Sequence, residues 1–164
     1  MSSADESATR RGSLTLIVRR VIAATPERLF EAWTCPAELR HWWGPESVTC
    51  TAAEVDLQVG GRYRIANRLP DGTTLWISGE YEHIDRPRKL VYTWRIGPGS
   101  QPSELVTVTF EAHPRGTEVV VVHEHIGEAV TRDRHEQGWR GCLDGLGAYL
   151  SRGVQELPPR RTGV

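Results

Sequence analysis

The spacing of hydrophobic positions changes along the chain, and each spacing predicts a different kind of element. Residues 14–23 are rich in β-branched side chains and predict a strand. Two short helices are expected next. The first begins after Thr25, whose hydroxyl can cap free backbone amides and which is followed by Pro26, a residue tolerated at the first helical position. The second covers 36–43.

From residue 48 onward the period is two, which is the period of a strand with one buried face. Glycine, proline and aspartate punctuate this region, and Gly60 and Gly61 predict a tight turn with positive φ. Because the turns are short, successive strands must run antiparallel. The predicted strands cover 48–57, 62–68, 74–84, 89–96, 104–112 and 117–126.

The last predicted element is a long helix over 131–151. Its apolar residues recur at helical spacing, namely Trp139, Cys142, Leu143, Leu146, Tyr149 and Leu150. Gly138, Gly141, Gly145 and Gly147 interrupt it, and each costs about 1 kcal/mol relative to alanine. Packing must therefore hold this helix. The glycines allow close approach to the sheet, which is the favoured interpretation, or leave room for a ligand.

Together these elements predict an α+β fold in the order β-α-α-β6-α. A curved antiparallel sheet of about seven strands would wrap around the C-terminal helix and enclose a hydrophobic cavity. We expect one domain over 13–152, with solvated tails at 1–12 and 153–164.

Composition narrows the class of protein. The 164 residues carry 20 basic and 21 acidic side chains and a net charge of −1, so nucleic acid and anionic membranes are not expected partners. Cys35, Cys50 and Cys142 form no CxxC motif, and their odd number favours a reducing compartment. The N-terminal segment lacks the apolar core of a signal peptide, and we expect a cytoplasmic protein.

Aromatic residues dominate the predicted inner face. The chain has six tryptophans and only two phenylalanines. Rings between sheet and helix can stack on a ligand, while an indole N–H or a phenol supplies a polar contact. An ordinary packed core is the alternative. The candidate ligand-binding residues are Trp33, Tyr63, Tyr92, Trp94, Val108, Phe110, Val121, His123, Trp139, Leu143 and Leu146.

Evidence for catalysis or a metal is thin. His123 and His125 are two apart on a strand, so both imidazoles are expected on one face. A zinc site needs further ligands, and there is no HExxH motif to supply them. We therefore expect no metal and no cofactor. A buried, hydrogen-bonded His123 is favoured over a general base, and no GxSxG motif indicates a serine nucleophile.

Several spaced motifs resemble one family across almost the whole domain. They are WWGP at 42–45, DLQVGGRY at 56–63, GEY at 79–81, LVYTW at 90–94, VTVTF at 106–110 and GW at 138–139. The chain resembles bacterial homologues of the activator of the ninety-kilodalton heat-shock chaperone ATPase. That family lies within the START-like, birch-pollen-allergen-like (SRPBCC) superfamily.

The resemblance implies a helix-grip fold with a hydrophobic cavity. It leaves chemistry open, because relatives in the superfamily carry lipids, sterols or hormones and some are aromatase/cyclases. Chaperone activation does not follow, since the eukaryotic activator contacts the chaperone through a separate domain.

Three functions remain as hypotheses. The leading one is a non-enzymatic binding protein for a small hydrophobic or aromatic molecule. The second is an enzyme of the polyketide cyclase or dehydratase type, in which His123 or a tyrosine moves a proton. The third is a protein-interaction module that contacts a chaperone, with Trp42 and Trp43 as its motivation, and a homodimer is a further partner to consider.

Overall fold

The computed structural model describes residues 12–45, 47–98 and 102–162, with side chains as far as residue 152. The elements are β1 (Leu14–Ile22), α2 (Pro26–Thr34), α3 (Pro36–Trp42), β2 (Thr49–Val55), β3 (Arg62–Arg68), β4 (Thr74–Asp85), β5 (Lys89–Ile96), β6 (Glu104–His113), β7 (Gly116–Ile126) and α4 (Ala129–Thr162).

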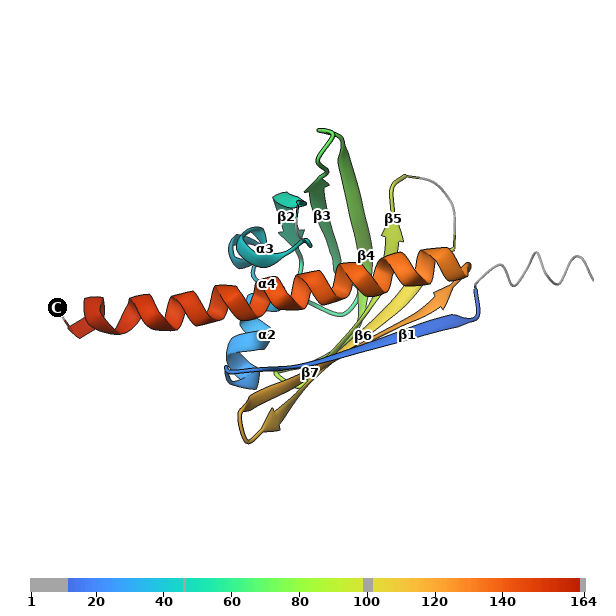
Figure 1. The fold of residues 1–164 in the computed structure, drawn as a ribbon. Coiled ribbons are helices and arrows are strands. Elements are labelled where there is room, and N and C mark those ends of the chain that lie inside the picture. The colour runs from blue at the N-terminus through green and yellow to red at the C-terminus, as the bar shows by residue number, and fades with distance from the viewer. Residues whose placement is uncertain (1–11, 46, 99–101, 163–164) are drawn as a thin grey trace, which may run out of the picture.

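The seven strands form one antiparallel sheet in the order β1-β7-β6-β5-β4-β3-β2. Figure 1 shows α4 lying across this sheet, with α2 and α3 near one end of it. The arrangement is the helix-grip fold, and the predicted fold class and element order are confirmed.

Local sequence signals set the helix starts and the turns. The Thr25 side chain accepts a hydrogen bond from the backbone N–H of Arg28 and caps α2, whose first residue is Pro26. Gly60 has φ +87°, as the predicted turn requires, and its N–H donates to the carbonyl of Tyr81 at 2.8 Å.

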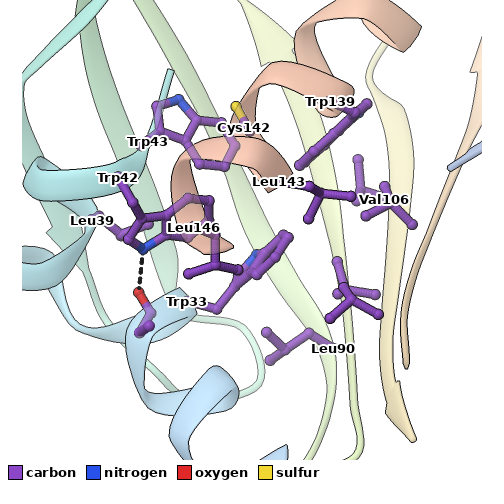
Figure 2. Close-up of a cluster of buried hydrophobic side chains, with 14 of the residues drawn as sticks. Trp33, Leu39, Trp42, Trp43, Leu90, Val106, Trp139, Cys142, Leu143 and Leu146 are labelled. Atoms are coloured by element: carbon purple, nitrogen blue, oxygen red, sulfur yellow. Dashed lines mark hydrogen bonds between the residues drawn. The ribbon is translucent and has the colours of Figure 1, made fainter. Parts of the chain in front are cut away.

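One large core joins the inner face of the sheet to the helices. It includes Trp33, Trp42, Trp43, Leu90, Val106, Trp139, Leu143 and Leu146, which Figure 2 shows converging from both layers. Trp42 is 2% exposed and Trp43 6% exposed. These two side chains are therefore packed in the core, and contact with a chaperone stays a prediction.

The end of β7 departs from the predicted alternation. Leu16 pairs with His123 but Leu14 pairs with Ile126, so the register shifts between them. His125 has φ +68°, and Ile126 takes the buried position. The prediction that His123 and His125 share a face is wrong, because this bulge turns His125 away.

Helix α4 is longer than predicted at both ends. It begins at Ala129, and its backbone continues to Thr162, through much of the stretch expected to be a tail. Figure 1 shows its last turns projecting beyond the sheet. The tail at 1–12 lies almost wholly outside the described residues. Among the described helices, none is long and apolar enough to cross a membrane.

Candidate functional site

Aromatic rings fill the centre of the space between the curved sheet and the helices, which we call the cup. Trp33, Tyr63 and Tyr92 border a remaining space of only about 20 Å³. Trp33 Nε1 donates to Tyr92 Oη at 3.2 Å, and Tyr63 Oη donates to the carbonyl of Thr93 at 2.6 Å. Burial raises the pKa of both tyrosines well above the ordinary value, so both phenols stay neutral. This region is packed core rather than a ligand cavity.

The candidate ligand-binding residues divide between this core and its edge. All are buried, as expected for the inner face, and the fully enclosed ones are Val108, Phe110, Val121, His123, Leu143 and Leu146. Trp94 and Trp139 instead border a larger space. Whether any of the set binds a ligand stays a prediction.

That larger space lies between the first half of α4 and the ends of β3, β4 and β5, and it holds about 190 Å³. We call it the Trp94–Asn67 pocket. Cavities on the order of 150 Å³ can hold one benzene-sized ring. Its walls are mostly apolar and include Trp43, Val48, Leu69, Leu75, Ile77, Trp94, Ile96, Gly138, Trp139 and Cys142, with Asn67, Arg134 and His135 as polar members.

Two buried polar atoms in these walls have no hydrogen-bond partner among the residues that the structure describes. They are the indole nitrogen Nε1 of Trp94 and the amide oxygen Oδ1 of Asn67. Both side chains belong to residues only 6% exposed. An unpaired buried polar group costs about 1–3 kcal/mol, so either side chain would gain by turning its polar atom toward a molecule bound in the pocket.

Glycine makes room for the pocket on the helix side. A Cβ built at Gly138 would meet nothing within 4 Å, whereas one at Gly145 would lie 2.8 Å from the carbonyl oxygen of Trp42. Close packing therefore explains Gly145, and open space explains Gly138. Gly145 thus packs closely against α3 rather than against the sheet, and a ligand in the space at Gly138 stays a prediction.

A cluster of titratable residues adjoins the pocket. Glu104, at the start of β6, accepts hydrogen bonds at Oε1 from His123 Nε2 at 2.7 Å and from His135 Nε2 at 3.0 Å. Burial raises the pKa of Glu104, but these hydrogen bonds outweigh it and lower the pKa to about 2. Glu104 is therefore ionised at neutral pH.

His123 is held in one protonation state by its neighbours. Its Nδ1 accepts a hydrogen bond from Trp139 Nε1 at 3.0 Å, so Nδ1 carries no proton and Nε2 carries the proton donated to Glu104. Burial lowers the pKa of His123 and keeps the ring neutral, against the opposing effect of Glu104.

The ligand atoms of Glu104, His123 and His135 lie within 4.8 Å of one another, which is close enough to share a metal ion. The hydrogen bonds argue against it. A metal on His123 Nε2 would require the proton on Nδ1, where it would face the N–H of Trp139. These residues do not fit a metal without moving Trp139, and they fit proton transfer as they stand.

The two buried cysteines are poor nucleophiles. Burial raises the pKa of Cys142 to about 12 and also raises the pKa of Cys50. The backbone N–H of Gly44 donates to Cys142 Sγ at 3.4 Å, which fixes that side chain in the wall of the pocket. A thiol with a raised pKa reacts slowly, because the thiolate is the reactive form.

Sequence reasoning missed Asn67, Glu104 and His135. Asn67 is in phase with the buried Tyr63 on β3, and Glu104 is in phase with Val106 on β6, so the strand period marks both as inward-facing polar residues. His135 precedes Trp139 by one helical turn, which places it on the same side of α4.

Comparison with known proteins agrees with this fold. The family model described as Activator of Hsp90 ATPase homolog 1-like protein matches residues 23–151. A solved structure from Chromobacterium violaceum is 28% identical with a TM-score of 0.76, over 82% of this chain and 95% of the other. The AHSA1 protein of Silicibacter pomeroyi is 27% identical with a TM-score of 0.76, over 85% and 99%.

The AHSA1-like protein of Aeromonas hydrophila, at 22% identity, shares the fold with a TM-score of 0.73 over 88% of this chain and 96% of the other. No match is found among curated proteins. Because the family model covers most of the domain, from the end of β1 into α4, this chain belongs to the family of Activator of Hsp90 ATPase homolog 1-like proteins.

Proposed function

We propose that this protein binds a small apolar or aromatic molecule, with at least one polar group, in the Trp94–Asn67 pocket. The observation that carries the proposal is the pair of unpaired atoms, Trp94 Nε1 and Asn67 Oδ1, in the wall of an apolar space of about 190 Å³. Ligand sites are commonly apolar with a few placed polar groups, and this pocket has that composition.

The packing at the centre of the cup also favours the Trp94–Asn67 pocket as the binding site, because the centre is already filled. The indole of Trp33 and the phenol of Tyr63 already donate hydrogen bonds there, and only about 20 Å³ remains. A molecule placed in the centre would have to displace packed rings, whereas one beside Gly138 would not.

A pair of probes of the same shape tests the proposal. Indane and 1-indanone share one bicyclic frame, but only the ketone can accept a hydrogen bond from Trp94 Nε1. We expect both to bind and 1-indanone to bind tighter, by about 0.5–1.5 kcal/mol for the added hydrogen bond. In Trp94→Phe the advantage of the ketone should disappear. Chemical-shift titration of the labelled protein measures both affinities.

Two glycine variants supply the control. Gly138→Leu should fill the pocket and abolish binding of both probes. Gly147→Leu makes the same change in the same helix but borders a different space, beside β1, and should leave binding unchanged. If Gly138→Leu and Gly147→Leu bind the two probes equally well, the probes bind outside the Trp94–Asn67 pocket, which contradicts the proposal.

A further inference from the structure

His135 is the polar group of the cluster that remains open to the pocket. Its ring lines both the Trp94–Asn67 pocket and a second cleft of about 390 Å³ that also borders Glu104. Its side chain is 10% exposed, and no residue that the structure describes hydrogen-bonds to its Nδ1. The ring is therefore reachable by a molecule bound beside it.

The hydrogen bond to Glu104 determines which nitrogen of His135 is basic. A carboxylate can only accept, so His135 Nε2 must carry the proton that it donates to Glu104 Oε1 at 3.0 Å. In the neutral ring, Nδ1 then holds the free lone pair. A carboxylate behind an imidazole also stabilises the imidazolium that forms when the free nitrogen takes up a proton.

His123 and Trp139 support this arrangement from behind. Trp139 Nε1 fixes the tautomer of His123, and His123 fixes the carboxylate of Glu104. Both nitrogens of His123 are occupied and its side chain is fully buried, so it cannot exchange a proton with a ligand. Glu104, His123 and Trp139 are positioning residues, and the sequence hypothesis that named His123 as the base is replaced by one naming His135.

Trp94 supplies the complementary donor. Its unpaired indole nitrogen belongs to a ring whose centroid is 6.0 Å from that of His135, and the two residues line the same pocket. One small molecule in the pocket therefore lies beside both rings, and a small rotation of the Trp94 ring would bring its N–H to that molecule. A base and a hydrogen-bond donor beside one carbonyl group can together stabilise the charge that develops on its oxygen.

We propose that the pocket catalyses enolisation of a small ketone or aldehyde, with His135 as the general base and Trp94 as the donor to the carbonyl oxygen. His135 Nδ1 takes a proton from the carbon next to the carbonyl. The C–H electron pair forms the carbon–carbon double bond, and the π pair of the carbonyl moves to the oxygen, which accepts the hydrogen bond from Trp94. Returning the proton to carbon or to oxygen completes an isomerisation that consumes no co-reactant. This inference rests on the proposed function, since it needs a ligand in the same pocket.

Hydrogen exchange tests the step directly. In D2O, the protein should accelerate exchange of the hydrogens on the carbon beside the carbonyl of 1-indanone, as followed by proton NMR. General bases contribute roughly 10²–10⁴-fold and oxyanion donors about 10²–10³-fold. We therefore expect His135→Gln and Trp94→Phe each to lower the exchange rate by about 100-fold. His83→Gln, at an exposed histidine of β4, should leave it unchanged.

A second measurement examines the positioning of His135. Nitrogen-15 NMR of the imidazole rings distinguishes a protonated Nε2 from a protonated Nδ1. Both His123 and His135 should show the proton on Nε2, and Glu104→Gln should reduce that tautomer at His135 while the variant stays folded by circular dichroism. A protonated Nδ1 on His135 in the unaltered protein would overturn the assignment of the base.

These experiments distinguish a failure of the enolisation proposal from a failure of the proposed binding function. If 1-indanone binds in the pocket but exchanges at the rate of buffer alone, enolisation is overturned while the proposed binding function stands. If exchange is accelerated but His135→Gln does not slow it, the assignment of the base is overturned. If neither indane nor 1-indanone binds, the proposed function fails, and this inference fails with it.

Discussion

Two parts of the interface between α4 and the sheet are both built around tryptophan. They differ in whether the buried indole N–H groups have hydrogen-bond partners. In the closed part, around Trp33 and Trp42, each indole N–H has a partner: Trp33 donates to Tyr92, and Trp42 donates to the carbonyl of Ala32. In the open part, the indole N–H of Trp94 has no partner within the described parts of the chain. Figure 2 shows the hydrogen bond of Trp42 within the closed part.

The closed and open parts also differ in how much space their side chains leave unfilled. The ring of Trp33 lies 5.0 Å from that of Trp42 and 5.7 Å from that of Phe110, and only about 20 Å³ is left nearby. The open part keeps about 190 Å³ beside Gly138. Tryptophan content alone therefore does not identify a binding site. Unpaired polar atoms beside unfilled volume are the reason to propose one around Trp94.

The largest expected effect lies in the closed part. Trp33→Ala removes a buried ring and the donor to Tyr92, and should lower the free energy of unfolding by about 3–5 kcal/mol. Urea denaturation measures the loss. Trp76→Ala is the matched control, because Trp76 is on β4, only partly buried, and stacks on Arg64 at 4.3 Å. A loss no greater than that of the control would contradict the assignment of Trp33 to the packed core.

In the open part, the largest expected change in the free energy of unfolding depends on pH. The pKa of Glu104 is lowered to about 2, so its hydrogen bonds stabilise the folded state above the ordinary carboxyl value of 4.5. That contribution is lost as the pH falls from about 4.5 toward 2. At pH 7, Glu104→Gln should lower the free energy of unfolding by an amount on the order of 2 kcal/mol, and the difference from the unaltered protein should close in acid.

The control for this prediction is Glu54→Gln. Glu54 pairs with Arg64 at 3.0 Å on the surface, and its side chain is 64% exposed. Exposed ion pairs contribute about 0–1 kcal/mol. A similar pH dependence in both glutamine variants, measured by urea denaturation at several pH values, would show that the cluster around Glu104 has no special role.

The fold was largely predictable because its signals are local. Alternation and turn residues placed the strands Arg62–Arg68 and Lys89–Ile96 at their observed bounds. The bulge at His125 was not predictable, because it comes from a register shift against β1, which is distant in the sequence. Local alternation alone extends the strand through that position and gives the wrong face.

The site was predictable only in part. Trp94 and Trp139 follow from the inner-face pattern, whereas the meeting of Glu104 with His135 depends on where α4 crosses the sheet. No spacing in the chain encodes that crossing. Asn67 could have been found, since a polar residue in phase with Tyr63 and Ile65 is unusual on an inner face.

The smallest expected changes in the free energy of unfolding should have opposite signs in the two parts. Gly145→Ala would put a Cβ 2.8 Å from the carbonyl oxygen of Trp42, and we expect a net loss of about 1 kcal/mol after the gain in helix propensity. Gly138→Ala meets nothing within 4 Å, so the helix propensity of alanine should stabilise the protein by about 0.5–1 kcal/mol. Thermal unfolding of both variants measures the pair.

Opposite signs would mean that α4 is held against α3 at Gly145 and spans open space at Gly138, as the two parts of the interface require. Destabilisation by both substitutions would mean that the Trp94–Asn67 pocket is closed in solution, because an added methyl group would then have no room. The same single-methyl change on one helix thus reports on filled and unfilled volume, with the chemistry of the substitution held constant.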